Sequence, residues 1–274
     1  MTELADILHD ALTVARRELT LAFQGRRSIL LIVGLMVLAA LPAAARAAVG
    51  AGQDGAALQQ AQVLAMVQVF PREVVRYLLD CPQPLIVGIL ATLFFQPAYV
   101  LLVGSETLAG EIESGSIRFS AARASRTGVL LGKSLGLWAT IAALTLVVHT
   151  VIWVTSTLGP AGSAAGVVRW GPKLYLISCA VALVPVSMVI LLGALSSRPR
   201  RVIVAGVILI AALRVGRVAL ANHGFRMATF LPGGLDDRLL SPSPAMVASG
   251  IGLALAWAAV LLGAAALAFN RRSV

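Results

Sequence analysis

Residues 245–270 read AMVASGIGLALAWAAVLLGAAALAFN and contain no charged side chain. A helix needs about 20 apolar residues to cross the hydrocarbon core of a bilayer. Because backbone N–H and C=O groups in lipid must be paired within the protein, a stretch of this kind predicts a transmembrane helix. It follows the helix-breaking tetrapeptide at 241–244, which reads Ser-Pro-Ser-Pro, and ends at the basic pair Arg271 and Arg272.

Other apolar runs of similar character precede this one. They are 28–45, 81–105, 134–168 with a break near Gly159-Pro160, 174–197 and 202–220. The run at 202–220 carries Arg214 and Arg217 in its final third. Both arginines can extend toward the outer interface if this helix runs from inside to outside. We therefore expect six spans.

The composition of the whole chain supports this class of protein. Of the 274 residues, 59% are hydrophobic and 12% are charged, and the mean hydropathy is +0.91. Soluble domains carry about 25% charged residues. No alternating ten-residue strands typical of a membrane barrel occur. The prediction is an all-α integral membrane protein.

The net charge of +10 would suggest nucleic-acid binding in a soluble protein. Here the basic residues lie at the ends of apolar runs, where orientation and anionic lipid headgroups explain them. With six spans, both termini and the most basic segments face the cytoplasm. We expect a multi-pass protein of the inner, cytoplasmic membrane that contacts lipids and binds no nucleic acid.

Residues 1–27 predict an amphipathic helix on the cytoplasmic surface, followed by the membrane domain at 28–274. Apolar residues recur there every three to four positions: Leu4, Leu8, Leu12, Ala15, Leu19 and Phe23. A cleaved export signal is the alternative, since Arg26-Arg27 precede an apolar run. The five later spans argue against it. Two outer segments, 46–80 and 221–244, are long enough to fold, and Pro71 can begin a short helix in the first.

The segment 105–127, between the second and third spans, contains the charged residues on which the functional prediction depends. Residues 104–133 read GSETLAGEIESGSIRFSAARASRTGVLLGK. The acids Glu106, Glu111 and Glu113 come first, then a turn at Gly115, then the bases Arg118, Arg123, Arg126 and Lys133. A charged helix of this kind can orient a soluble partner. The alternative is a solvated loop whose arginines only set the orientation of the chain.

Two parts of this segment resemble the ABC-2-type permeases, the membrane subunits of one class of ATP-driven transporters. They are AGEIESGS at 109–116 and LLGK at 130–133. Arg16 and Arg17 also resemble that family's surface helix, and the length suits single-domain members such as the permease that helps mature nitrous oxide reductase. Two departures are Ser116, where threonine is usual, and the lack of proline near residue 122.

The resemblance implies a division of labour. The chain has no Gly-x-x-x-x-Gly-Lys-(Ser/Thr) loop, so we expect no enzymatic activity, no catalytic residue and no cofactor in it. ATP and Mg would bind a partner ATPase, two copies of which dock on the 105–127 coupling helix and the Arg16-Arg17 helix. A second, identical permease chain would complete an exporter homodimer.

Two other functions stay open. One is a non-transporting coupler that passes the ATPase cycle to a periplasmic partner, as in maturation of an extracytoplasmic metalloenzyme. The other, an intramembrane enzyme or anchor, is weakened because the spans hold no paired acids and no serine–histidine pair.

Four polar residues inside the spans are candidates for a substrate pathway: Gln96, His149, Arg214 and Arg217. Pro97 should free a backbone carbonyl, and Thr145 lies one turn before His149. The alternative for each is hydrogen bonding between helices or an arginine that reaches the interface. The two cysteines and three histidines are too scattered to predict a disulfide or a metal site.

Overall fold

The structure is a computed structural model that describes residues 2–24, 64, 66–67, 70–122, 124–158, 164–223 and 225–271. Within these residues every regular element is helical, which confirms the all-α class. The long helices are α1 (Thr2–Gln24), α5 (Gln83–Ser105), α8 (Arg126–Leu158), α9 (Ala164–Leu195), α10 (Pro199–Asn222) and α12 (Pro244–Asn270). Short elements are α4 (Arg72–Leu79), η1 (Glu106–Gly110), α6 (Glu111–Glu113), α7 (Ile117–Ala121), η2 (Arg226–Phe230), η3 (Pro232–Gly234) and α11 (Leu235–Leu239).

Five helical stretches are long and apolar enough to cross a membrane. They are Gln83–Glu113, Arg126–Leu158, Ala164–Leu195, Pro199–Leu220 and Pro244–Asn270. These agree with five of the six expected spans, and the chain has the character of a multi-pass membrane protein. The expected first span, 28–45, lies outside the described residues. The fourth span begins earlier than the sequence predicts, at Ala164 instead of residue 174, because Arg169 and Lys173 continue its helix.

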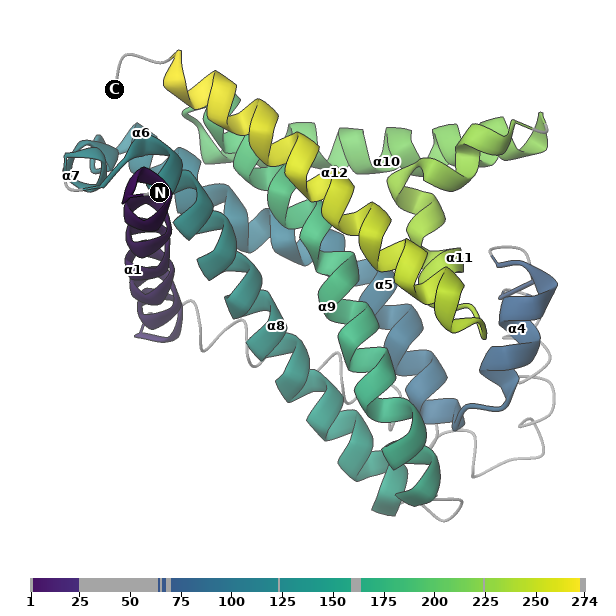
Figure 1. The fold of residues 1–274 in the computed structure, drawn as a ribbon. Coiled ribbons are helices and arrows are strands. Elements are labelled where there is room, and N and C mark those ends of the chain that lie inside the picture. The colour runs from purple at the N-terminus through teal and green to yellow at the C-terminus, as the bar shows by residue number, and fades with distance from the viewer. Residues whose placement is uncertain are drawn as a thin grey trace.

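Helices α5, α9 and α12 run in one direction and α8 in the other, which gives the bundle two ends, and α10 lies across them (Figure 1). One buried cluster joins the start of α5, the end of α8 and the first half of α9, together with α4 and α11. A second joins the end of α5, the start of α8, the second half of α9 and the last turns of α12. We call these the α11 end and the α1 end.

Helix α9 is the core of the bundle, and α10 is its most exposed long helix. Most of α9 is buried against α5, α8 and α12. Most of the apolar span in α10 is not covered by the described parts of the chain, and Val204, Ile208 and Val215 are all exposed. In lipid, such a surface needs no protein partner.

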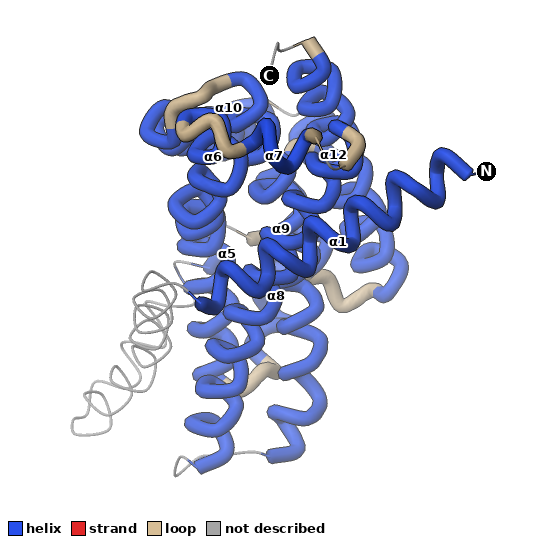
Figure 2. The backbone as a smooth tube through the Cα atoms, turned by 90° about the vertical axis from the view of Figure 1, so that its left-hand side faces the viewer, coloured by secondary structure: helices blue, strands red, loops and turns tan. Residues whose placement is uncertain are grey.

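Helix α1 lies across α8 at the α1 end (Figure 2). It packs through Ala11 and Ala15, which are buried, whereas Leu4, Leu8 and Leu12 are 66%, 52% and 61% exposed. The amphipathic helix is therefore present at 2–24. Of the expected apolar stripe, Ala15 packs on the protein, whereas Leu4, Leu8 and Leu12 remain exposed.

A folded cap closes the α11 end. Helix α4 begins directly after Pro71, as the sequence predicts, and Leu78 is fully buried. Lys173 of α9 donates a 2.6 Å hydrogen bond to the Tyr77 hydroxyl, and its Nζ lies 4.5 Å from the centroid of that ring. The expected outer loop at 221–244 contains two short 3₁₀ turns and α11, and Leu239 is fully buried.

Candidate functional site

At the α1 end, one buried lysine joins three segments of the chain. Lys133 of α8 is 1% exposed, and its Nζ lies 2.8 Å from Oε1 of Glu18 on α1. The same Nζ lies 2.8 Å from Oε1 of Glu111, at the start of α6. An ammonium group is buried at acceptable cost only when it is paired and hydrogen-bonded, and two carboxylates satisfy this condition. We call these three residues the lysine triad.

The backbone of α8 makes room for this arrangement. A Cβ at Gly132 would lie 2.6 Å from the carbonyl oxygen of Ala11, and one at Gly136 would lie 2.7 Å from Cβ of Glu18. Because these positions are glycines, α1 lies close enough for Glu18 to reach Lys133. In the LLGK motif, Gly132 therefore allows the close contact between helices, and Lys133 forms the ion pairs.

The start of α8 is also fastened to α1. The Ser125 hydroxyl accepts a 3.1 Å hydrogen bond from the Gly128 N–H and so caps the helix. The Ser125 N–H donates to Oδ2 of Asp10 at 2.8 Å. Glu18 and Asp10 were not predicted as site residues. They are two of the four acids on α1, and nothing in the sequence distinguished them or revealed their partners.

The acidic segment forms a bent extension of α5. The chain passes from α5 through the π-helical turn η1 into α6. A separate turn follows α6 and contains Gly115, whose φ is +74°. Glycine is favoured there because other residues rarely adopt a positive φ. The expected turn at Gly115 is present, but the expected coupling helix is divided into η1, α6 and α7, and the π-helical turn was not foreseen. It changes the direction in which the acids face.

The predicted coupling residues separate into two groups. Glu111 points inward to Lys133, whereas Glu106, Glu113 and Arg118 lie on the exposed surface. Arg16 and Arg17 are exposed on α1. Nη1 of Arg126 donates to the Asn270 carbonyl oxygen at 3.3 Å and so links α8 to the end of α12. Arg123 lies outside the described residues.

Two of the predicted pathway residues, Gln96 and His149, belong to one buried polar cluster across α5, α8 and α9. Nε2 of Gln96 donates to the Ser178 carbonyl oxygen at 3.1 Å. The Ser178 hydroxyl lies 3.4 Å from Nε2 of His149, and Nδ1 of His149 lies 3.0 Å from the Thr145 carbonyl oxygen. The contacts of these residues are those of hydrogen bonding between helices, the alternative interpretation. The expectation that the spans hold no serine–histidine pair was wrong, because the fold brings Ser178 of α9 beside His149 of α8. Thr145 contributes its backbone to His149 and its hydroxyl, at 3.5 Å, to Gln96.

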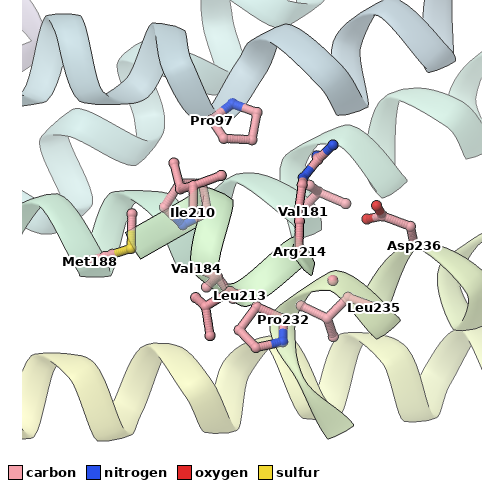
Figure 3. Close-up of a pocket in the computed structure, with 12 residues that line it drawn as sticks. Pro97, Val181, Val184, Met188, Ile210, Leu213, Arg214, Pro232, Leu235 and Asp236 are labelled. Atoms are coloured by element: carbon pink, nitrogen blue, oxygen red, sulfur yellow. The ribbon is translucent and has the colours of Figure 1, made fainter. Parts of the chain in front are cut away.

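Arg214 reaches from α10 to the kink region of α5. Pro97 has no N–H, so the carbonyl of Leu93, four residues earlier, lacks its usual helical donor. Nη2 of Arg214 donates to that oxygen at 2.9 Å. The sequence predicted the free carbonyl but not the arginine that donates a hydrogen bond to it. Arg214 also lines a pocket with Pro97, Val184 and Asp236 (Figure 3).

Arg217, one turn further along α10, is held by the loop that contains α11. Its guanidinium donates to the Gly233 carbonyl oxygen and pairs with Oδ2 of Asp237. The neighbouring Asp236 forms no direct ion pair with either arginine among the described residues. Burial raises the pKa of Asp236 to about 6, although Arg214 and Arg217 act in the opposite direction. The two arginines of α10 thus lie near two aspartates of the loop. Of the described residues, only Arg217 and Asp237 form a direct ion pair here.

No family model matches the chain, and no curated protein matches it. The function is therefore inferred from the lysine triad and from the polar residues inside the spans.

Proposed function

We propose that the chain is the membrane subunit of an ATP-driven transporter of the ABC-2 type, moved by a separate ATPase. The lysine triad is the observation that carries this proposal. It joins the acidic extension of α5 and the surface helix α1 to the start of α8. A partner that moved the extension would therefore also move α1 and α8.

The exposed charges around the triad suit a soluble partner. Glu106, Glu113 and Arg118 lie on the outside of the extension, and Arg16 and Arg17 lie on α1. Charge complementarity of this kind fixes the orientation of a partner more than its affinity. For the cycle to do work, the ATPase must bind one membrane conformation more tightly than the other.

The remaining architecture follows from the same proposal. The run at 28–45 would be a sixth span, because α1 and α4 lie at opposite ends of the bundle (Figure 1). Both termini would then face the cytoplasm of the inner membrane, where ATP is available. Two identical membrane chains and two ATPases would form the transporter. ATP and Mg would be bound by the ATPases.

A mechanical coupler is the second candidate, and the cap at the α11 end favours it. Helices α4 and α11 are packed into the same buried cluster as α5 and α9. A movement of α5 could therefore reach an extracytoplasmic partner docked on this cap. A coupler would keep the ATPase contact but move no cargo across the membrane.

Affinity purification of the tagged chain from its native membrane tests the shared part of both candidates. We expect an ATPase subunit to co-purify, and the double charge reversal Glu113→Lys with Arg118→Glu to release it. Both side chains are exposed, so this variant should fold. Arg169→Glu, an exposed charge reversal on the first turns of α9, is the matched control and should retain the ATPase.

An ATPase that stays bound to the double variant at unchanged yield would show that the extension is not the docking surface. Purification of the intact wild-type chain with no ATPase would contradict the proposed function itself. Transport of a labelled cargo into vesicles, driven by ATP, separates an exporter from a coupler.

A further inference from the structure

Arg214 is held by α5 on one side of the pocket shown in Figure 3. Its Nη2 donates to the Leu93 carbonyl oxygen at 2.9 Å, and its guanidinium carbon lies 5.8 Å from the centroid of the Phe94 ring. Pro97 has removed the usual donor of that carbonyl. The arginine of α10 therefore replaces a helical hydrogen bond of α5.

Asp236 lies on the other side of the same pocket. In Figure 3 its carboxylate points toward the guanidinium of Arg214, with open space between the two groups. It forms no hydrogen bond and no direct ion pair with any described side chain, whereas the neighbouring Asp237 pairs with Arg217. Removal of a carboxylate from water is costly when no partner replaces the water. Asp236 is thus the acceptor at this site that lacks a donor.

The pocket between the two acceptors is small but not filled. Its volume is ≈ 60 Å³, whereas a cavity needs only about 10–15 Å³ to hold a water molecule. Arg214 and Asp236 are the charged residues that line it, and its other walls are mostly apolar. The space therefore suits a movement of the guanidinium group from one acceptor to the other.

We propose that Arg214 is a two-position switch, whose guanidinium bonds either to the Leu93 carbonyl of α5 or to the Asp236 carboxylate of the α11 loop. The structure shows the first position. Each position pairs one acceptor and leaves the other without a donor, so a movement of α5 or of the loop can shift the balance. The inference goes beyond the proposed function, because the exchange takes place within this chain and needs no partner.

The ionisation of Asp236 reports the position of this switch. Burial raises its pKa to about 6, and the charged groups that act on it are Arg214 and Arg217 of α10 and Asp237 of its own loop. No charged residue of α5 or α9 lines the pocket. A cation in contact with a carboxyl group lowers its pKa by about 1–3 pH units. The pKa of Asp236 is therefore expected to be lower in the second position than in the first.

The experiment titrates Asp236 in the purified full-length chain in detergent, through the infrared band of its protonated carboxyl group. Asp236→Asn removes this band and so identifies it. Pro97→Ala restores the N–H that bonds the Leu93 carbonyl, and thereby releases Arg214 from its first position. The midpoint of the titration should fall by about 1–3 pH units in this variant, although the substitution changes no charge.

A second variant weakens the first position without changing the kink of α5. Phe94→Leu removes the ring beside the guanidinium and should lower the midpoint in the same direction, by a smaller amount. Phe94 is 65% exposed, so this variant does not require the core to repack. Pro185→Ala is the matched control. It removes the proline of α9 that lines the same pocket, but the carbonyl that Pro185 leaves free is not bonded to Arg214, so the midpoint should stay in place.

The double variant Pro97→Ala with Arg214→Gln shows whether the arginine causes the effect. Its midpoint should equal that of Arg214→Gln alone, because no guanidinium remains to move. A fall that Pro97→Ala still produces without Arg214 would overturn the proposal. An unchanged or raised midpoint in both Pro97→Ala and Phe94→Leu would overturn it as well. The assay contains no ATPase, so its failure leaves the proposed partner untouched.

Discussion

Lys133 is the residue on which the α1 end of the molecule depends. Its ammonium group is almost fully buried, and the two carboxylates that neutralise it come from segments more than 90 residues apart, around Glu18 and Glu111. Removal of one member of a buried ion pair usually costs more than the pair contributes, because the remaining charge stays buried without a partner. Removal of the lysine therefore measures the cost of leaving the two carboxylates without a cation, and not the net contribution of the triad.

We expect Lys133→Met to lower the free energy of unfolding by about 3–5 kcal/mol, as is typical when one partner of a buried pair is lost. Two half-buried carboxylates would then face each other without a cation. The measurement is the thermal midpoint of the purified chain in detergent. Glu113→Gln, which removes an exposed acid of the same segment, is the control and should leave the midpoint in place.

The triple variant Lys133→Met, Glu18→Leu, Glu111→Leu should recover much of the lost stability, because no charge then remains buried. If it retains stability but no longer binds the ATPase, the triad positions the extension as proposed. A lysine variant that melts at the wild-type temperature would show that the triad does not stabilise the fold.

Two contacts between elements explain why these helices meet where they do. The first is the crossing of α1 over the glycines of α8. The Cβ that alanine would add at position 132 meets a backbone oxygen, which cannot move aside as a side chain would. The second is the bond from Arg214 to the carbonyl that Pro97 leaves free.

We expect Gly132→Ala to loosen α1 from α8. Overpacking of a close contact costs about 1–3 kcal/mol, so roughly 5- to 150-fold more of the chain should have α1 detached. A cysteine at Ala11, a residue of α1 that is buried where α1 crosses α8, reports this through its rate of thiol labelling. Gly263→Ala is the control, because a Cβ there meets nothing within 4 Å. Equal labelling rates in both variants would contradict the close contact.

The proline–arginine contact allows a rescue experiment. Arg214→Gln should lower the thermal midpoint, because the Leu93 carbonyl then has no donor in an apolar surrounding. Pro97→Ala restores the N–H that bonds this carbonyl within the helix. The double variant should therefore be more stable than Arg214→Gln alone. Strictly additive effects would show that the two residues are not coupled.

The apolar runs of the sequence and its helix-breaking prolines and glycines predicted most elements correctly. The five apolar runs, the start of α4 after Pro71 and the turn at Gly115 all followed from local chemistry. The packing face of α1 did not, because an apolar stripe has the same appearance whether it faces lipid or protein. Here the small residues Ala11 and Ala15 make the close contact and the leucines remain free.

The partners of charged residues could not be predicted for a similar reason. Lys133 was counted among the basic residues of the loop, because the amino-acid sequence does not show that its helix crosses α1. The π-helical turn at Glu106–Gly110 turns Glu111 inward, and no sequence pattern specifies such a turn. Contacts that depend on the crossing of distant helices require the structure.

At the scale of the whole molecule, the two ends of the bundle differ in kind. The α1 end carries the lysine triad and an exposed charged extension, and the α11 end carries the apolar pocket and the folded cap. Helix α5 contributes to both, through Leu93 at one end and the extension at the other. A single tilting helix could therefore join partner binding to a change at the pocket.

This arrangement requires that the extension and the cap face opposite sides of the membrane. The two native cysteines, Cys81 and Cys179, are buried and should give little background to a membrane-impermeant thiol reagent. In sealed inside-out vesicles, Ser114→Cys should be labelled and His223→Cys should not. In intact cells the pattern should reverse, because both positions are exposed in the structure but lie beyond opposite ends of the spans. Labelling of both positions from the same side would contradict the placement of the extension and the cap on opposite sides of the membrane. Reversed labelling, with Ser114→Cys reached in intact cells, would leave the fold in place and rule out an ATPase at the extension.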